Sequence, residues 1–288
     1  MTDIGFIGAG TVGTALAVRL SERGYPVIAV SSRSHSSAEK LATRIKNCRA
    51  VKDGQEVASL AELIFITTPD DAIAPVVSAV NWRKGQSVVH CNGAASTDIL
   101  ERARSAGAQV GGFHPLQSFA SLKEALENLP GSVFAIEAEK PLYSALSEMA
   151  ADLKGRSIRL TGADKVLYHA AAVITSNYTV ALLKMATDLW QTFGIPPAEA
   201  ASALLPLLQG TVNNIARIGL PNCLTGPIAR GDTGTIRRHL AALQDRAPGI
   251  LETYRQLALQ TIPVALAKGR IGEKTANQMR TLLQGKES

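Results

Sequence analysis

The sequence of 288 residues contains little cysteine, and the placement of that cysteine argues against two classes of protein. Cys48, Cys91 and Cys223 are odd in number and widely spaced, with no Cys-x-x-Cys pair. This pattern disfavours a disulfide framework or a zinc site and indicates a reducing compartment. The first predicted strand starts by residue 3, which leaves no room for a signal or transit peptide. We therefore expect a cytoplasmic protein without a metal ion.

Long apolar runs and aromatic residues are also scarce. No apolar run reaches the length that spans a bilayer, so we expect no membrane partner. Five Tyr and two Trp offer few rings for base stacking, and the basic residues behind the net charge of +6 are scattered singly. We therefore expect no nucleic-acid partner and interpret the charge as general surface, with a bias towards anionic small molecules.

The residues that are present point first to a nucleotide. A glycine-rich turn follows the strand-like residues 4–7 and precedes a helical pattern over residues 14–20. Its glycines allow a tight turn, close approach of a pyrophosphate and close packing of helix on strand. Free N–H groups at the helix start then face the phosphates. The predicted cofactor contacts in this turn are Gly8, Ala9, Gly10, Thr11, Val12 and Gly13.

The end of the second predicted strand favours NADP(H) over NAD. NAD-binding folds usually carry an acidic residue there, which accepts from the ribose hydroxyl. This chain has Ser31, Ser32 and Arg33 instead, and a guanidinium flanked by hydroxyls suits a 2′-phosphate. The alternative is that Arg33 is simply an exposed loop residue. Cofactor contacts are also predicted after a later strand, at Thr67, Thr68 and Pro69.

The pattern of elements predicts an α/β fold with two domains. Short β-like runs alternate with helical patterns over the first 160 residues, which implies a doubly wound, mostly parallel sheet of the Rossmann type. From Gly162 onward only helical patterns remain. We predict a nucleotide-binding domain over 1–161 and an all-helical domain for substrate binding and dimerisation over 162–288. Residues 165–193 predict one long helix, buried nearly all round as a central or an interface helix would be.

That helix carries the first catalytic candidates. Lys165 and His169 are four residues apart and share a face, with Ser176 roughly on the same face and Asn177 beside it. A carbonyl that is reduced by hydride needs a proton donor and a polar clamp on its oxygen. A partly buried lysine with a lowered pKa can donate the proton. The alternative is a surface lysine in the first turn and a structural histidine in the core.

Two further candidates follow predicted strands of the first domain. His114 begins a His-Pro-Leu-Gln loop. It is a candidate to bind a carboxylate or to relay a proton, and the alternative is a structural histidine. Gln117 in the same loop is a candidate substrate contact. Asn92 is predicted to lie near the nicotinamide, where an amide holds a substrate oxygen or the cofactor's carboxamide. Cys91 has no paired base nearby and is interpreted as a small apolar residue.

Residues 224–232 form an unusual connector, Leu-Thr-Gly-Pro-Ile-Ala-Arg-Gly-Asp. Arg230 in this segment is a candidate to clamp a substrate carboxylate with two hydrogen bonds. Alternatively, Arg230 and Asp232 form an ion pair that shapes the loop. The sequence alone leaves both interpretations open.

Three segments together carry a family resemblance: residues 113–117, 168–172 and 224–232. With them, the whole chain resembles the Rossmann-like reductases of the broad ketopantoate reductase, hydroxyacid dehydrogenase and 6-phosphogluconate dehydrogenase superfamily. It is most similar to a subgroup of mostly unassigned proteins, some of which are thought to act as alternative ketopantoate reductases. The resemblance implies a homodimer built partly by residues 165–193.

The resemblance also suggests roles for single residues. Lys165 matches the catalytic lysine of the hydroxyacid dehydrogenases, whereas His169 stands where their asparagine would be. Asn92 resembles an asparagine of ketopantoate reductases, and His114 with Pro115 is similar to a turn in prephenate dehydrogenases.

We therefore expect an NADPH-dependent reductase of a small 2-oxo acid, with 2-dehydropantoate as the best single substrate. Lys165 would donate the proton, His169 and Asn92 would orient the oxygen, and His114 and Arg230 would hold the carboxylate. One alternative is a dehydrogenase or imine reductase acting on a prephenate-like or pyrroline-type metabolite. The other is an NADP-binding protein without chemistry.

Overall fold

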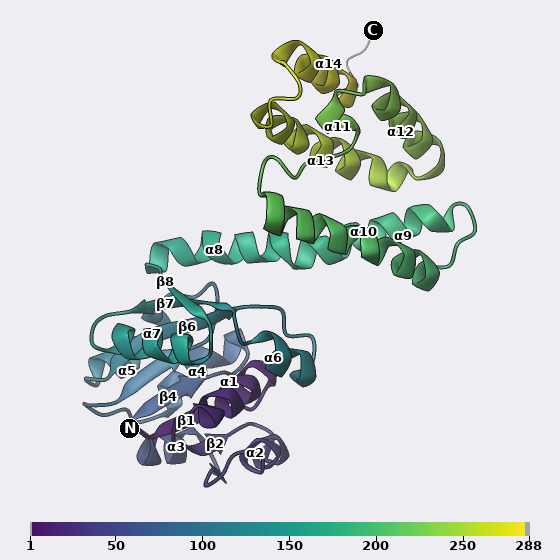
Figure 1. Cartoon of the computed structure of the whole chain (residues 1–288). Coiled ribbons are helices and arrows are strands. Elements are labelled where there is room, and N and C mark those ends of the chain that lie inside the picture. The colour runs from purple at the N-terminus through teal and green to yellow at the C-terminus, as the bar shows by residue number, and fades with distance from the viewer. Residues whose placement is uncertain (1, 286–288) are drawn as a thin grey trace. The chain divides into compact units, whose positions relative to one another are not determined.

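A computed structural model describes residues 2–285 of the chain. It forms two compact units, residues 1–176 and residues 177–288. The first unit contains the sheet and the second is helical (Figure 1).

One eight-stranded sheet organises the first unit, in the order β3-β2-β1-β4-β5-β6-β7-β8. All neighbouring strands run parallel except β6 and β7. The prediction of a mostly parallel sheet is thereby confirmed. The strands are β1 (Ile4–Ile7), β2 (Val27–Ser31), β3 (Arg49–Ala50), β4 (Leu63–Ile66), β5 (Ser87–His90), β6 (Gln109–Leu116), β7 (Val133–Ala138) and β8 (Arg156–Arg159).

Helices cover both faces of this sheet, as a doubly wound fold requires. One apolar core lies under α1, α2, α6 and α7, and the other lies under α3, α4, η1 and α5. The helices of the first unit are α1 (Thr11–Glu22), α2 (His35–Ala42), α3 (Gly54–Leu60), α4 (Asp70–Ala79), the 3₁₀ helix η1 (Thr97–Leu100), α5 (Glu101–Ser105), α6 (Leu122–Asn128), α7 (Leu142–Asp152) and α8 (Gly162–Thr175).

The central strands are apolar on both faces because each face is covered. Every residue of β1 and β4 is buried. Phe6 of β1 stacks on Phe65 of β4 with ring centroids 5.1 Å apart, and Phe113 of β6 stacks on Phe134 of β7 at 4.7 Å. Since β1, β4, β5 and β6 are parallel, their carboxyl ends meet at one edge of the sheet, where α/β folds bind ligands.

Strand β6 extends further than the sequence suggested. Instead of ending at Phe113, it continues to Leu116, because β7 pairs with it antiparallel and places His114 opposite Ala135. The pairing with β5 ends at Gly112, so Pro115 lies where one flank of β6 has no partner strand and its missing N–H is tolerated. His114 is therefore held on a strand and not in a loop.

The second unit contains helices only, which confirms the helical character expected for this part of the chain. Its core joins α12, α13 and α14 through side chains such as Leu240, Ile262 and Met279. Pro206, a residue type that commonly breaks or kinks a helix, lies inside a continuous α10. The helices are α9 (Asn177–Gln191), α10 (Pro197–Ile218), α11 (Pro227–Arg230), α12 (Thr233–Arg246), α13 (Pro248–Ala267) and α14 (Glu273–Leu283).

The expectation that residues 165–193 form one buried helix is wrong. The structure has α8 and α9 with Ser176 between them, and their apolar side chains lie largely in solvent: Leu167 is 76% exposed and Val180 is 70% exposed. By length and composition the stretch Gly162–Gln191 could cross a membrane. The sequence suggested no such stretch, because polar residues interrupt it and only the averaged hydropathy is high.

The contacts of α8 show that lipid cannot surround this helix on every side. Lys165 in its first turn is 2% exposed and donates a hydrogen bond to the carbonyl oxygen of Asn92. One face of α8 therefore packs against the first unit's sheet. The boundary predicted near residue 161 falls at the start of α8, whereas the two compact units meet at its end.

Candidate active site

The glycine-rich turn after β1 has the close contacts that its motif predicts. Gly8 has φ +116°, and a Cβ on it would lie 2.7 Å from the carbonyl of Thr67. A Cβ on Gly13 would lie 2.3 Å from Oγ1 of Thr67. Around Gly10, in contrast, a Cβ would meet no atom within 4 Å. The turn therefore packs tightly against β4 and opens into free space at the start of α1.

A cleft of about 540 Å³ lies in front of this turn. Two hydroxyl oxygens of residues that line it, Ser31 Oγ and Thr68 Oγ1, are buried and have no hydrogen-bond partner in the described protein. The Thr67 hydroxyl instead donates to the carbonyl of Gly8 at 2.8 Å and holds the turn. The predicted cofactor contacts that line the cleft are Gly8, Ala9, Gly10, Ser31, Ser32, Arg33, Thr67, Thr68 and Pro69.

The charges of the cleft suit an additional phosphate. The exposed Arg33 lies on it, and so does Lys52, which the sequence analysis did not identify. The nearby Asp53 carboxylate accepts from the backbone N–H of Glu56 and thereby caps α3. The start of α1 has neither a side-chain cap nor an acidic residue in its first turn, so its N–H groups remain available to an anion. The cleft therefore fits a phosphate-rich dinucleotide.

A second group of polar side chains surrounds Gly93, just after β5. A Cβ on Gly93 would lie 2.6 Å from Cδ2 of His169 and 2.9 Å from Nε2 of His114. Nδ1 of His114 is 2.8 Å from the hydroxyl of Tyr168. The structure thus brings together residues from the end of β5, from β6 and from α8, as the candidate roles of His114 and His169 require.

Lys165 lies beneath this group. Its Nζ donates to the carbonyl oxygen of Asn92 at 3.1 Å and lies 3.7 Å from Oε2 of Glu137 on β7. With 2% of its surface exposed it is not a surface lysine, so that alternative is wrong. Burial lowers the pKa of Lys165, while the Glu137 carboxylate acts in the opposite direction.

Four other titratable groups of this region, His90, His114, Tyr168 and Cys91, are neutral at pH 7. Burial lowers the pKa of His90 to about 3 and that of His114 to about 4. Burial also raises the pKa of Tyr168 and of Cys91, each to about 12. A protonated thiol at Cys91 agrees with its interpretation as a small apolar residue.

Asn92 and Gln117 have structural contacts in the first unit. The side-chain oxygen of Asn92 accepts from the backbone N–H groups of Ala94 and Ala95 and so shapes the turn after β5. The Gln117 side chain donates to the carbonyl of Asn128. Both substrate roles stay predictions.

The remaining substrate candidates lie at the end of α8 or in the second unit. Ser176 is exposed at the C-terminus of α8, and Asn177 begins α9. Arg230 is exposed at the end of α11, while Asp232 caps α12 by accepting from Thr235. These three substrate roles also stay predictions.

Two residues of the Gly93 group were missed as site residues. Tyr168 was quoted only within a motif, although its position three residues after Lys165 places it on the same helix face. Glu137 is an acid inside the otherwise apolar strand Val-Phe-Ala-Ile-Glu-Ala, which is the signal that could have identified it.

Comparisons with known proteins agree with this architecture. Residues 1–115 match the family model "Rossmann-like domain", and residues 132–261 match the model "Domain of unknown function (DUF2520)". The first unit is a Rossmann-like domain. The comparison with curated proteins gives no match.

Among solved structures, the chain is similar to a protein from Bacteroides fragilis described as a candidate NADP oxidoreductase, with 27% identity, a TM-score of 0.71 and coverage of 91% of this chain and 98% of that one. A reductive aminase from Aspergillus terreus in complex with NADPH and ethyl-5-oxohexanoate has 17% identity and a TM-score of 0.62, covering 99% and 93%. A 1-pyrroline-5-carboxylate reductase from Streptococcus pyogenes has 15% identity and a TM-score of 0.62, covering 97% and 98%. Of these neighbours, one is described as an NADP oxidoreductase, one is in complex with NADPH, and one is described as a reductase.

The buried His90 predicts an acid-sensitive first unit. Its folded pKa of about 3 lies below the value of roughly 6.5 in an unfolded chain, so its contribution to stability is full above pH 6.5 and is lost as the pH falls towards 3. His90→Asn keeps an acceptor for the backbone N–H of Asn92 and removes the titration. Between pH 6.5 and 4, the free energy of unfolding should fall by about 3 kcal/mol more in the parent than in His90→Asn.

Urea unfolding followed by Trp82 fluorescence, in a Trp190→Phe background, measures this difference in the first unit. The exposed His35 supplies the matched control, His35→Asn, whose pH dependence should equal that of the parent. If the free energy of unfolding changed with pH equally in the parent and in His90→Asn, the lowered pKa of His90 would be contradicted.

Proposed function

We propose that this protein is an NADP(H)-dependent reductase that acts on a small molecule with a C=O or C=N bond. One observation carries the proposal: the nucleotide cleft and the polar group around Gly93 lie at the same edge of one sheet. The cleft is built after β1, β2 and β4, and the polar group follows β5 and includes β6. A reductase needs a dinucleotide cleft and a proton donor side by side.

The comparisons support NADP(H) as the cofactor, which supplies a hydride when it is bound. The start of α1 would hold the pyrophosphate, and Arg33 with Lys52 would hold the 2′-phosphate. The unpartnered hydroxyls of Ser31 and Thr68 would donate to or accept from the same ligand.

The protein's own residues would supply and place the proton. Lys165 is the proton donor in this proposal, because burial lowers its pKa towards the range in which an ammonium gives up its proton. When the Tyr168 hydroxyl donates to Nδ1 of His114, the Nε2–H of His114 is directed towards Gly93. His114 and His169 would then orient the substrate oxygen or nitrogen at that position.

Two substrate classes follow from different observations. The resemblance to ketopantoate reductases favours a 2-oxo acid, and 2-dehydropantoate is the first compound to test. The likeness in fold to a reductive aminase and a pyrroline-5-carboxylate reductase makes an imine the second candidate. Both classes need the same proton donor, so one variant tests the mechanism for either.

NADPH consumption across a panel of 2-oxo acids, cyclic imines and carbonyl–amine mixtures tests the function. Lys165→Met keeps the volume of the side chain and removes its proton, and it should lower kcat with any active substrate by about 100-fold or more. Lys184→Met, at an exposed lysine of α9, is the control and should keep full activity. Turnover of no compound would overturn the proposal, and full activity of Lys165→Met would overturn the mechanism.

Arg33 should determine the preference for NADPH over NADH. Loss of its charge-assisted hydrogen bonds in Arg33→Ala should weaken NADPH binding by about 10- to 100-fold and leave NADH binding nearly unchanged. Arg44→Ala removes an exposed arginine that does not line the cleft and serves as the control. Calorimetric titration of both nucleotides measures the effect, and equal losses for NADPH and NADH would contradict this role.

The exposed apolar side chains of α8, α9 and α10 support a homodimer. Large apolar patches on a protein surface mark interfaces. We propose that a second copy covers the exposed apolar side chains of α8 in the first unit and those of α9 and α10 in the second unit, as the family resemblance implies. The side chains concerned are Val166, Leu167 and Ile174 on α8, Tyr178, Val180 and Leu182 on α9, and Leu205, Leu207, Val212, Ile215 and Ile218 on α10.

Sedimentation velocity tests the dimer. The native chain should sediment as a dimer, and the double change Val180→Asp with Leu207→Asp should yield a folded monomer, because two buried carboxylates per copy oppose association. Leu257→Asp places the same charge on α13, outside these helices, and should remain dimeric. A monomeric native chain, or flotation of the protein with phospholipid vesicles, would contradict the proposal.

A further inference from the structure

We propose that Glu137 is the positioning residue of Lys165: it anchors the lysine at the Gly93 group and keeps it protonated. This inference rests on the proposed role of Lys165 as proton donor. It assigns a role to an acid that none of the motifs in the sequence contains.

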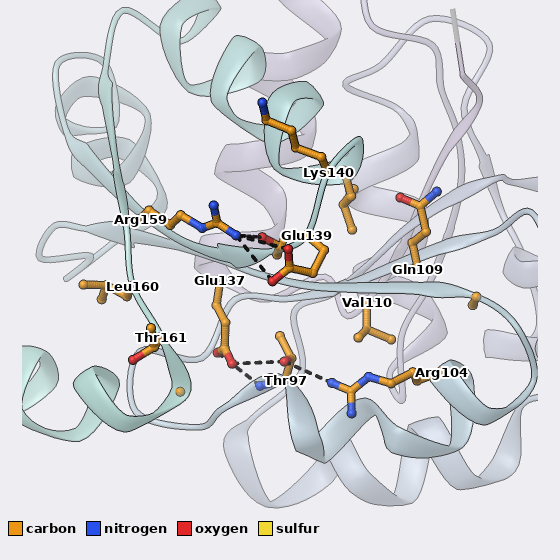
Figure 2. A pocket seen from close by; sticks show the side chains of 14 residues that line it. Thr97, Arg104, Gln109, Val110, Glu137, Glu139, Lys140, Arg159, Leu160 and Thr161 are labelled. Carbon is orange, nitrogen blue, oxygen red and sulfur yellow. Dashed lines mark hydrogen bonds and ion pairs between the residues drawn. The ribbon is translucent and has the colours of Figure 1, made fainter.

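Glu137 is held firmly in place. Its Oε2 accepts from the backbone N–H of Thr97 at 3.1 Å, and its Oε1 accepts from the hydroxyl of Thr97 at 3.0 Å. The side chain is 14% exposed. Figure 2 shows Glu137 on the wall of a cavity of about 440 Å³, directed towards Thr97. A carboxylate fixed by two such bonds keeps its charge at a defined point.

The start of α8 is built against this carboxylate. A Cβ on Gly162 would lie 2.9 Å from Cβ of Ser96 and 3.1 Å from Oε1 of Glu137, so only glycine lets the first turn approach so closely. The positive end of the helix dipole stabilises a carboxylate at this position. Lys165 follows Gly162 by three residues, so the acid lies close both to the start of the helix and to the ammonium.

Glu137 is the sole negative partner of this ammonium within residues 2–285. The titratable groups that interact with Lys165 besides Glu137 are His90 on β5, Cys91 after it and His114 on β6, and Tyr168 and His169 of α8 lie against His114. Four of them, His90, Cys91, His114 and Tyr168, are neutral at pH 7, as described above. Of the described carboxylates, only Glu137 raises the pKa of Lys165 against the effect of burial.

The arginines of the same cavity do not compete for Glu137. Arg104 pairs with Glu101 and also donates to the hydroxyl of Thr97 at 3.2 Å, and Arg159 pairs with Glu139 at 3.2 Å; Figure 2 shows the contacts with Thr97 and Glu139. Glu139 is therefore a matched control for Glu137: it follows the same strand, but its side chain is 93% exposed. Glu139→Gln removes an acid from the same cavity without touching Lys165.

The test is the pH titration of Lys165 in the protein without substrate, observed by NMR of [¹³Cε]lysine. The resonance of Lys165 is assigned by its loss in Lys165→Met. Glu137→Gln should lower the midpoint by about one to three pH units, because an opposite charge at this distance shifts a pKa by that amount. Glu139→Gln should leave the midpoint unchanged. An unchanged midpoint in Glu137→Gln would overturn the proposal.

A second variant covers the case in which Glu137→Gln does not fold. Glu137→Asp keeps the charge but moves it away from Lys165, so its midpoint should lie below that of the native protein, and an equal midpoint would overturn the proposal. With an active substrate, the alkaline limb of kcat/KM should move to lower pH in either variant. A purely structural role would lower activity without moving that limb. If no compound of the panel is turned over, the proposed function fails, but the NMR titration still tests the effect of Glu137 on Lys165.

Discussion

The ammonium of Lys165 is the group on which the site depends. A charge that is 2% exposed destabilises a fold unless polar partners surround it. Here the carbonyl of Asn92 and the carboxylate of Glu137 provide them, so one side chain ties the end of β5 and β7 to α8. These contacts hold α8 against the sheet, although by sequence it begins the helical domain.

Glycines make these contacts possible by letting backbone and side chains approach closely. A Cβ on Gly112 would lie 3.0 Å from Nζ of Lys165, and similar positions of Gly93 and Gly162 face His169 and Glu137. The three segments that carry the family resemblance contain neither Gly112 nor Gly162, whereas the turn after β1 is itself a glycine motif. The arrangement around Lys165 therefore depends on tertiary packing as much as the nucleotide cleft depends on its local motif.

This difference explains how much could be predicted from the sequence. The doubly wound sheet and the glycine turn follow from short-range patterns, and so does the shared face of Lys165 and His169. Glu137 could not be placed, because its partnership requires β7 to return antiparallel beside β6. The exposure of α8 and α9 was missed for a related reason: an apolar pattern is the same whether a helix faces its own core or another molecule.

The burial of Lys165 also bears on its proposed role as proton donor. In a site with little water, an ammonium interacts more strongly with developing negative charge than it would in solvent, and it needs no reorganisation when the charge forms. The same burial pushes its pKa down, and without an acid beside it the amine would lose its proton too early. The buried lysine and the fixed carboxylate therefore act together: burial lowers the pKa of Lys165, and the charge of Glu137 raises it again.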